Sequence, residues 1–86
     1  MNLKASPIGT PLKVLGISSA DGDDAISRRL MELGFIEGAV VEVRHRAPLF
    51  GDPIAVMVRG MLVALRRYEA ERVVVAEDIG SAGQRT

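Results

Sequence analysis

The sequence contains no cysteine, no tryptophan and a single histidine, His45. Without cysteine, the chain has no disulfide framework, no thiolate metal site and no cysteine nucleophile. With one imidazole and no recognisable set of nucleophile, base and orienting group, the sequence offers no catalytic centre. A GxxxxGKS/T phosphate loop is also missing, so nucleotide hydrolysis would have to belong to another protein. We therefore expect a binding protein and not an enzyme.

Long apolar runs are scarce. Runs such as those at 61–65 and 73–76 are far shorter than the roughly twenty residues of a membrane-spanning helix. The N-terminus has no apolar segment behind its charge and does not resemble a secretory signal. We expect no membrane span and a cytoplasmic location, and the lack of cysteine agrees with a reducing compartment.

The charges are balanced, with 11 basic and 11 acidic residues and a formal net charge of zero. No overall field therefore draws the chain to nucleic acid or to an anionic membrane surface. Electrostatic recognition has to be local. Several arginines gather in the second half of the sequence on neighbouring predicted strands, namely Arg44, Arg46, Arg59 and Arg66.

Hydrophobic residues make up 48% of the 86 residues and aromatic residues only 3%, so valine, leucine, isoleucine and methionine must fill the core. A chain of this length forms one hydrophobic core. We expect a single domain over residues 1–79 and a flexible C-terminal tail over residues 80–86.

Period-two alternation of apolar side chains predicts about five short strands. The first has apolar residues on both faces, which indicates substantial burial. The second has apolar residues on one face only, so Arg44 and Arg46 should share the opposite face. The predicted strands cover 12–17, 38–46, 54–59, 62–66 and 73–76.

A helix is predicted between the first and second strands. It should begin at Asp23 or Asp24, because a carboxylate there can accept hydrogen bonds from free backbone N–H groups. Gly34 supplies the left-handed residue that commonly ends a helix, and Phe35 should fold back onto Leu30 in a Schellman ending.

A single helical turn is predicted at 68–71, just before the last strand. Five short strands with one inserted helix and few long connections favour a closed or nearly closed barrel over a layered α/β fold. We therefore expect a mostly β domain, a small barrel of about five strands with one inserted α-helix and a short helical turn before the last strand.

The sequence contains an ordered series of segments, RRLMELGF at 28–35, Gly38, VEV at 41–43, APL at 47–49, GDPI at 51–54, ALR at 64–66 and EA at 69–70. Through these segments, the sequence from Leu3 to Val75 resembles the ferrous iron transport protein A (FeoA) family. The resemblance implies an SH3-like barrel in the bacterial cytoplasm. It also implies a non-catalytic accessory protein of ferrous iron uptake, which binds the membrane GTPase-transporter FeoB and modulates its activity or assembly.

The arginines and the loop after the second strand form the predicted partner-binding surface. Two prolines and a Gly-Asp pair take this loop out of the sheet and leave two apolar residues near its tip. Exposed apolar residues beside arginines are common at protein interfaces. We expect an acidic patch of the transporter to contact Arg44, Arg46, Leu49, Phe50 and Arg59.

His45 is the candidate metal ligand, since imidazole suits zinc and ferrous iron. It continues the face of Val41 and Val43 and should therefore lie, partly buried, at the barrel rim. One histidine cannot form a structural metal site. The alternatives are a rim histidine without a metal role and a weak surface site for zinc or iron shared with carboxylates of a second molecule. No cofactor is expected to be required.

Two other functions stay open at this point. A small barrel with a basic face could bind nucleic acid, although few aromatic residues and a neutral net charge argue against it. A metal-responsive regulatory module is the other alternative, for which ligands are few. A weak homodimer through an edge strand is also possible in principle.

Overall fold

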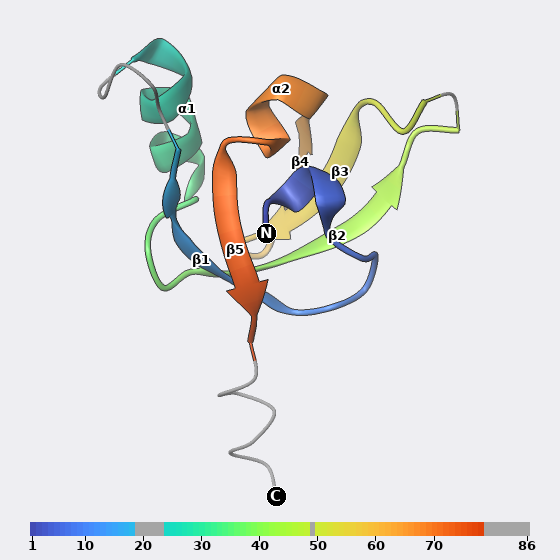
Figure 1. The fold of residues 1–86 in the computed structure, drawn as a ribbon, viewed down its shortest axis with the longest axis horizontal. Helices are drawn as coiled ribbons and strands as arrows, with labels where there is room; N and C mark the ends of the chain where they lie inside the picture. The colour runs from blue at the N-terminus through green and yellow to red at the C-terminus, as the bar shows by residue number, and fades with distance from the viewer. Residues whose placement is uncertain (19–23, 49, 79–86) are drawn as a thin grey trace, which may run out of the picture.

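The computed structural model describes residues 1–18, 24–48 and 50–78 (Figure 1). Five strands, one α-helix and two short helical turns follow one another along the chain. In order, they are η1 (Leu3–Ala5), β1 (Leu12–Ile17), α1 (Ala25–Leu33), β2 (Val40–Arg46), β3 (Ile54–Val58), β4 (Met61–Leu65), α2 (Arg67–Ala70) and β5 (Val73–Glu77).

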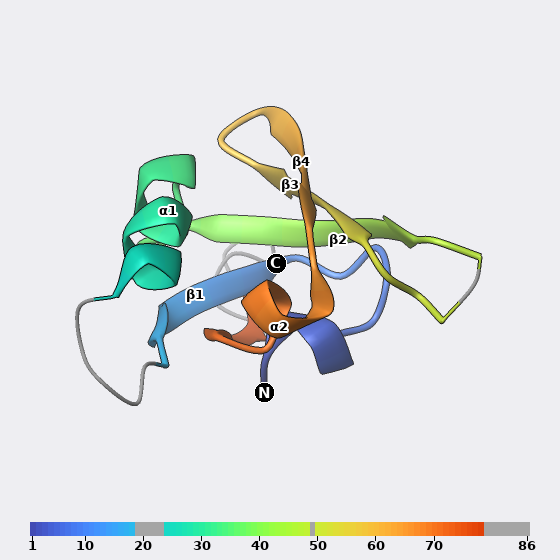
Figure 2. The same cartoon turned by 90° about the horizontal axis from the view of Figure 1, so that it is seen from above.

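All strand pairs are antiparallel, and the sheet has the order β4-β3-β2-β1-β5. The sheet curls so that β5 and α2 lie in front of the β3–β4 hairpin, as the two views in Figure 1 and Figure 2 show. The predicted mostly β fold, with five strands, an inserted helix and a helical turn before the last strand, is confirmed. The predicted tail over 80–86 lies outside the described residues.

The core is aliphatic with one aromatic residue, Phe35, which is fully buried. Around it, alternate residues of the strands turn inward. In β1, only Leu12 and Val14 are buried, whereas Lys13 and Leu15 face solvent. The prediction that β1 is buried on both faces is therefore wrong, because no described layer covers the outer side of the curled sheet at this strand.

Helix α1 begins and ends as the sequence indicates. The carboxylate of Asp24 accepts a hydrogen bond from the backbone N–H of Ser27, 2.8 Å away. At the other end, Gly34 takes a left-handed φ of 113°, and the N–H of Phe35 donates to the carbonyl of Leu30 over 3.0 Å. This is the expected Schellman ending, and it carries Phe35 into the core.

The two edges of the sheet differ. The outer edge of β5 receives the N-terminus, since Val75 donates to the carbonyl of Met1 over 2.8 Å and Asn2 bridges to Val74. Among the described residues, no segment pairs with the outer edge of β4. Within the same residues, no helix is long and apolar enough to cross a membrane.

Candidate partner-binding surface

A β-bulge in β2 sets the positions of the predicted arginines. Val43 pairs with Val56 and His45 with the next residue back along β3, Ala55, so Arg44 is the extra residue of the bulge. Arg46 then pairs with Ile54, which is buried. The prediction that Arg44 and Arg46 share a face is therefore wrong, since one inserted residue exchanges the faces of everything that follows.

Arg44 and Arg46 consequently have different surroundings. Arg44 is exposed and forms a 3.0 Å ion pair with Glu42. Arg46 is half-buried, and its guanidinium donates a hydrogen bond to the backbone carbonyl of Ser6. Its aliphatic stem also lies beside Gly51, because a Cβ at that glycine would be 3.7 Å from Cδ of Arg46. Arg46 thus ties the β2–β3 loop to the segment after η1.

The β2–β3 loop presents Phe50 to solvent. Its side chain is 88% exposed, more than any other large hydrophobic residue described, and its backbone has a φ of 64°. That left-handed conformation is uncommon for a bulky residue and turns the phenyl ring away from the core. The neighbouring candidate, Leu49, lies outside the described residues.

Arg59 lies at the other end of β3 from Phe50. It occupies the two-residue turn between β3 and β4 and has a φ of 53°. Its aliphatic stem packs on Gly34, at the C-terminal end of α1, where a Cβ would overlap Cδ of Arg59. The structure therefore does not gather the four described members of the predicted partner-binding set, Arg44, Arg46, Phe50 and Arg59, into one patch.

His45 projects from the outer face of the sheet next to the bulge. The bulge turns it away from the face of Val41 and Val43, so it is exposed and not partly buried as predicted. In the described ranges 1–18, 24–48 and 50–78, no three potential ligands of the His, Cys, Asp or Glu types gather. The described part of the chain therefore does not complete a three-ligand site around His45.

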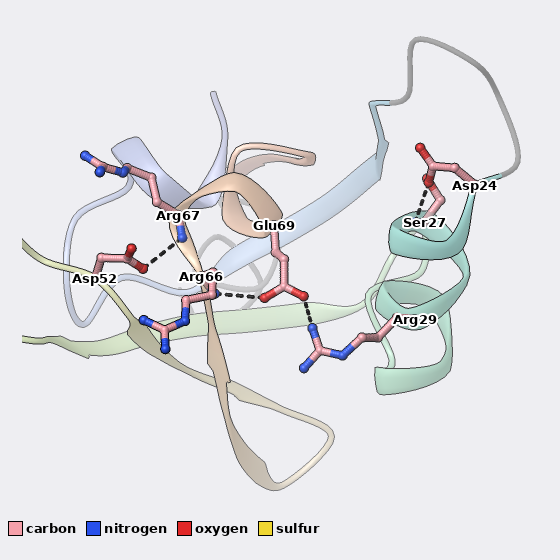
Figure 3. Close-up of polar contacts among 7 residues, drawn as sticks. All are labelled: Asp24, Ser27, Arg29, Asp52, Arg66, Arg67 and Glu69. Carbon is pink, nitrogen blue, oxygen red and sulfur yellow. Dashed lines mark hydrogen bonds and ion pairs between the residues drawn. The ribbon is translucent and has the colours of Figure 1, made fainter.

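A polar cluster that the sequence did not suggest joins α1 to α2 (Figure 3). Glu69 is buried, and its two carboxylate oxygens have separate donors: the guanidinium of Arg29 and, over 2.8 Å, the backbone N–H of Arg66. Asp52 likewise accepts a 2.9 Å hydrogen bond from the backbone N–H of Arg67. The carboxylates of Glu69, within α2, and of Asp52, in the β2–β3 loop, therefore both accept hydrogen bonds from the backbone at the start of the four-residue helix α2.

Sequence spacing offered a partial signal for this cluster. Glu69 is three residues after Arg66, the spacing at which a glutamate reaches back to the backbone N–H at the start of a helix. Nothing local pairs Glu69 with Arg29, because the two residues are 40 positions apart and meet only in the folded chain.

A second ion pair joins the start of α1 to the residue before β5. Arg72 contacts Asp24, with 2.9 Å between Nη2 and Oδ2. The hydrogen bond from Arg72, followed by the bond from the backbone N–H of Ser27, holds the pKa of the Asp24 carboxyl well below its usual range. Asp24 is therefore both the cap of α1 and its link to the residue before β5.

Between α1 and β4 runs an open groove of about 470 Å³. The lining comes from α1, from β4 and the residue after it, from Pro53 and from α2. The paired side chains of Arg29 and Glu69 both line it. The lining residues are Ala25, Ile26, Arg29, Pro53, Ala64, Arg66, Tyr68 and Glu69.

Comparison with known proteins identifies the family. The model of the FeoA domain matches residues 1–77. FeoA of Stenotrophomonas maltophilia, solved in complex with zinc, is 41% identical, with a TM-score of 0.79 over 88% of this chain and 89% of that one. That protein is described as a prokaryotic SH3 domain protein proposed to be a ferrous iron transport activating factor.

Two further solved structures agree. FeoA of Chlorobium tepidum is 40% identical, with a TM-score of 0.79 over 91% of this chain and 70% of that one. Iron(II) transport protein A of Clostridium thermocellum is 28% identical, with a TM-score of 0.83 over 93% of this chain and 47% of that one. No curated protein matches the sequence. The SH3-like fold is thereby confirmed, and the chain belongs to the FeoA family.

Proposed function

We propose that this chain is a non-catalytic, cytoplasmic accessory factor of ferrous iron uptake, which binds the cytoplasmic part of a FeoB-type GTPase-transporter and modulates its activity or assembly. The observation that carries the proposal is the family match over residues 1–77, together with the likeness to the S. maltophilia protein. The absence of a phosphate-loop motif from the sequence is consistent with a factor that acts on a GTPase and has no such activity itself.

The β2–β3 loop is the proposed first contact. Phe50, with Leu49 beside it in sequence, offers an exposed apolar anchor, and Arg44 is an exposed cation on the adjoining strand. Arg46 supports this loop from beneath through Ser6. Arg59 would contact the partner separately, from the far end of the β3–β4 hairpin.

Binding of the chain to the purified cytoplasmic domain of FeoB, measured by calorimetry, tests the proposal. Phe50→Ala should weaken binding by about tenfold or more, because truncating an aromatic anchor commonly costs about 2 kcal/mol or more. Ile36→Ala is the matched control, since Ile36 is exposed (53%) but lies between α1 and β2. Equal affinities for the wild-type chain and Phe50→Ala would remove the loop from the interface.

A weak zinc or ferrous iron site at His45, completed by carboxylates of a second molecule, is proposed as an accessory feature. Exposure of the imidazole on the outer face and the zinc complex of the S. maltophilia relative support it. Titration with zinc should give weak binding that His45→Ala abolishes and that grows with protein concentration. Zinc binding that is unchanged in His45→Ala would exclude His45 as a ligand.

A further inference from the structure

The outer edge of β4 carries free hydrogen-bonding groups at defined positions. Positive φ angles at Arg59 and Gly60 make the β3–β4 connection a two-residue type I′ turn, and Val58 pairs with Met61 across it. In such a ladder, hydrogen-bonded pairs alternate with non-hydrogen-bonded pairs. The N–H and C=O groups of Leu62 and Ala64 therefore point away from β3, toward the open edge.

This edge lacks the usual protection against strand addition. Within its five residues, β4 has no charge, no proline and no glycine, and Leu62 is 54% exposed. Edge strands are normally blunted by charges, prolines, bulges or a covering segment. The opposite edge of the sheet, at β5, is covered by Met1 and Asn2. The contrast marks the β4 edge as a surface that is kept open.

The groove between α1 and β4 provides the space. It reaches β4 at Ala64, and Ala25 and Ile26 of α1 also line it. A strand paired with Leu62 and Ala64 would therefore enter the groove at Ala64 and contact the helix there.

An arginine lies beyond each end of the β4 edge. Arg66 follows β4 and lines the groove, and Arg59 precedes β4 on the turn. Within residues 1–18, 24–48 and 50–78, neither guanidinium forms an ion pair with a carboxylate. The nearby carboxylate of Glu69 is already engaged by Arg29 and by the backbone of Arg66. An occupant with carboxylates at its ends would therefore be complementary.

The same charges disfavour a second copy of this chain as the occupant. Antiparallel pairing of two β4 edges about Val63 would place Leu62 opposite the other copy's Ala64. In that pairing, the β3–β4 turn of each copy, with Arg59, would lie beside the start of α2 of the other copy, with Arg66 and Arg67. Bringing these like charges together is destabilising.

We infer that the β4 edge, from Leu62 to Ala64, docks an extended segment of a partner protein, which adds to the sheet as a sixth strand. The segment is apolar at alternate positions and acidic at both ends. Main-chain hydrogen bonds to Leu62 and Ala64 would supply affinity, and the two flanking arginines would select the segment by charge. This inference rests on the proposed function for its biological meaning. It extends that function by naming the kind of segment that the transporter would present.

Hydrogen exchange of backbone amides, followed by NMR, tests the edge directly. The probe is a short synthetic peptide of alternating valine and threonine with a pair of glutamates at each end. Added to the full chain, it should slow exchange at Leu62 and Ala64 by about tenfold or more, because fast-exchanging exposed amides become hydrogen-bonded. Val63, whose amide already faces Val56 in the ladder, is the internal control and should change little.

Two variants separate backbone pairing from side-chain contact. Leu62→Pro removes the outward N–H and leaves the hydrogen bonds to β3 intact, because edge strands tolerate proline at such positions. It should reduce the affinity for the peptide about tenfold. Leu62→Thr keeps the N–H and should bind within about threefold of wild type. If Leu62→Pro fails to fold, the wild-type chain with a backbone N-methylated peptide replaces it, and that peptide should not bind.

A peptide of opposite charge tests whether the arginines select the partner segment. The same peptide with lysines in place of glutamates should bind at least about tenfold more weakly, and Arg66→Gln should reduce this difference. If the amides of Leu62 and Ala64 are protected from exchange in the free chain at high concentration, the edge pairs with a second copy and the inference is overturned. Exchange that does not change at a large excess of the glutamate peptide would also overturn it.

The transporter domain then distinguishes the two proposals. If it binds the wild-type chain and Leu62→Pro equally well, the edge inference fails and the proposed function stands. If the glutamate peptide protects the edge but the transporter domain does not bind, the edge inference stands and the proposed function fails.

Discussion

Glu69 is a nearly buried carboxylate whose neighbours make it a structural residue. It accepts hydrogen bonds from Arg29 and from the backbone of Arg66, so it connects α1 to the start of α2 (Figure 3). Replacing the charge while keeping the shape should therefore weaken both links. The same side chain also forms part of the groove beside β4.

Glu69→Gln should lower the free energy of unfolding by about 1 to 3 kcal/mol, the usual range for losing hydrogen bonds to a charged group. Urea denaturation measures it. In a double-mutant cycle, Arg29→Gln and Glu69→Gln together should cost less than the sum of the two single changes. Strict additivity would show that the pair contributes nothing to stability.

Gly34 is fixed by both conformation and packing. Its φ of 113° is a region that L-residues rarely adopt, and Arg59 and Val58 fill the space where a Cβ would lie. Gly34→Ala should lower the free energy of unfolding by about 1 to 3 kcal/mol. Gly16→Ala is the control, because Gly16 has no positive φ and no atom near its Cβ position. Similar losses from both substitutions would contradict this explanation.

At the residue scale, the sequence indicated which residues are candidates for the surface better than it indicated which face of a strand each side chain lies on. Phe50 was predicted to be exposed at a loop tip, and it is. Arg44, His45 and Arg46 were assigned faces by strict alternation, which the bulge at Arg44 breaks. A bulge depends on how two strands register against each other, so the residues of one strand alone do not predict it.

At the element scale, α1 shows how local signals suffice when they act over a few residues. A capping carboxylate, a terminal glycine and a returning Phe35 predicted both ends of the helix correctly. The link from Asp24 to Arg72 could not be predicted in the same way, since 48 residues separate the two.

The Asp24 cap also predicts a pH dependence. Because folding lowers the pKa of this carboxyl, its contribution to stability is complete above the unfolded pKa of about 4 and is lost as the pH falls below it. The free energy of unfolding should therefore decrease between about pH 4 and about pH 2 more steeply in the wild-type chain than in Asp24→Asn. Parallel curves for the two proteins would show that Asp24 is not coupled to folding.

At the scale of the whole molecule, the number, order along the chain and approximate bounds of the strands were predictable. Their order in the sheet was not, because it depends on pairing between segments far apart in the sequence, such as β1 with β5 and the N-terminus with β5. The groove beside β4 combines side chains from α1, β4 and α2, and no single stretch of sequence contains it.

We propose two contacts for a FeoB-type partner, the Phe50 loop and the β4 edge. Neither proposed contact needs a catalytic group on this chain. Both depend on binding to the partner, and so does the proposed function.

Chemical-shift mapping of the isotope-labelled chain with the unlabelled cytoplasmic domain of FeoB tests this dependence most directly. We expect saturable shifts at Phe50 and Gly51 and along Leu62 to Ala64, with Ile36 unchanged. A spectrum that stays the same at saturating concentrations of the FeoB domain would contradict the central claim that this chain acts by binding the transporter.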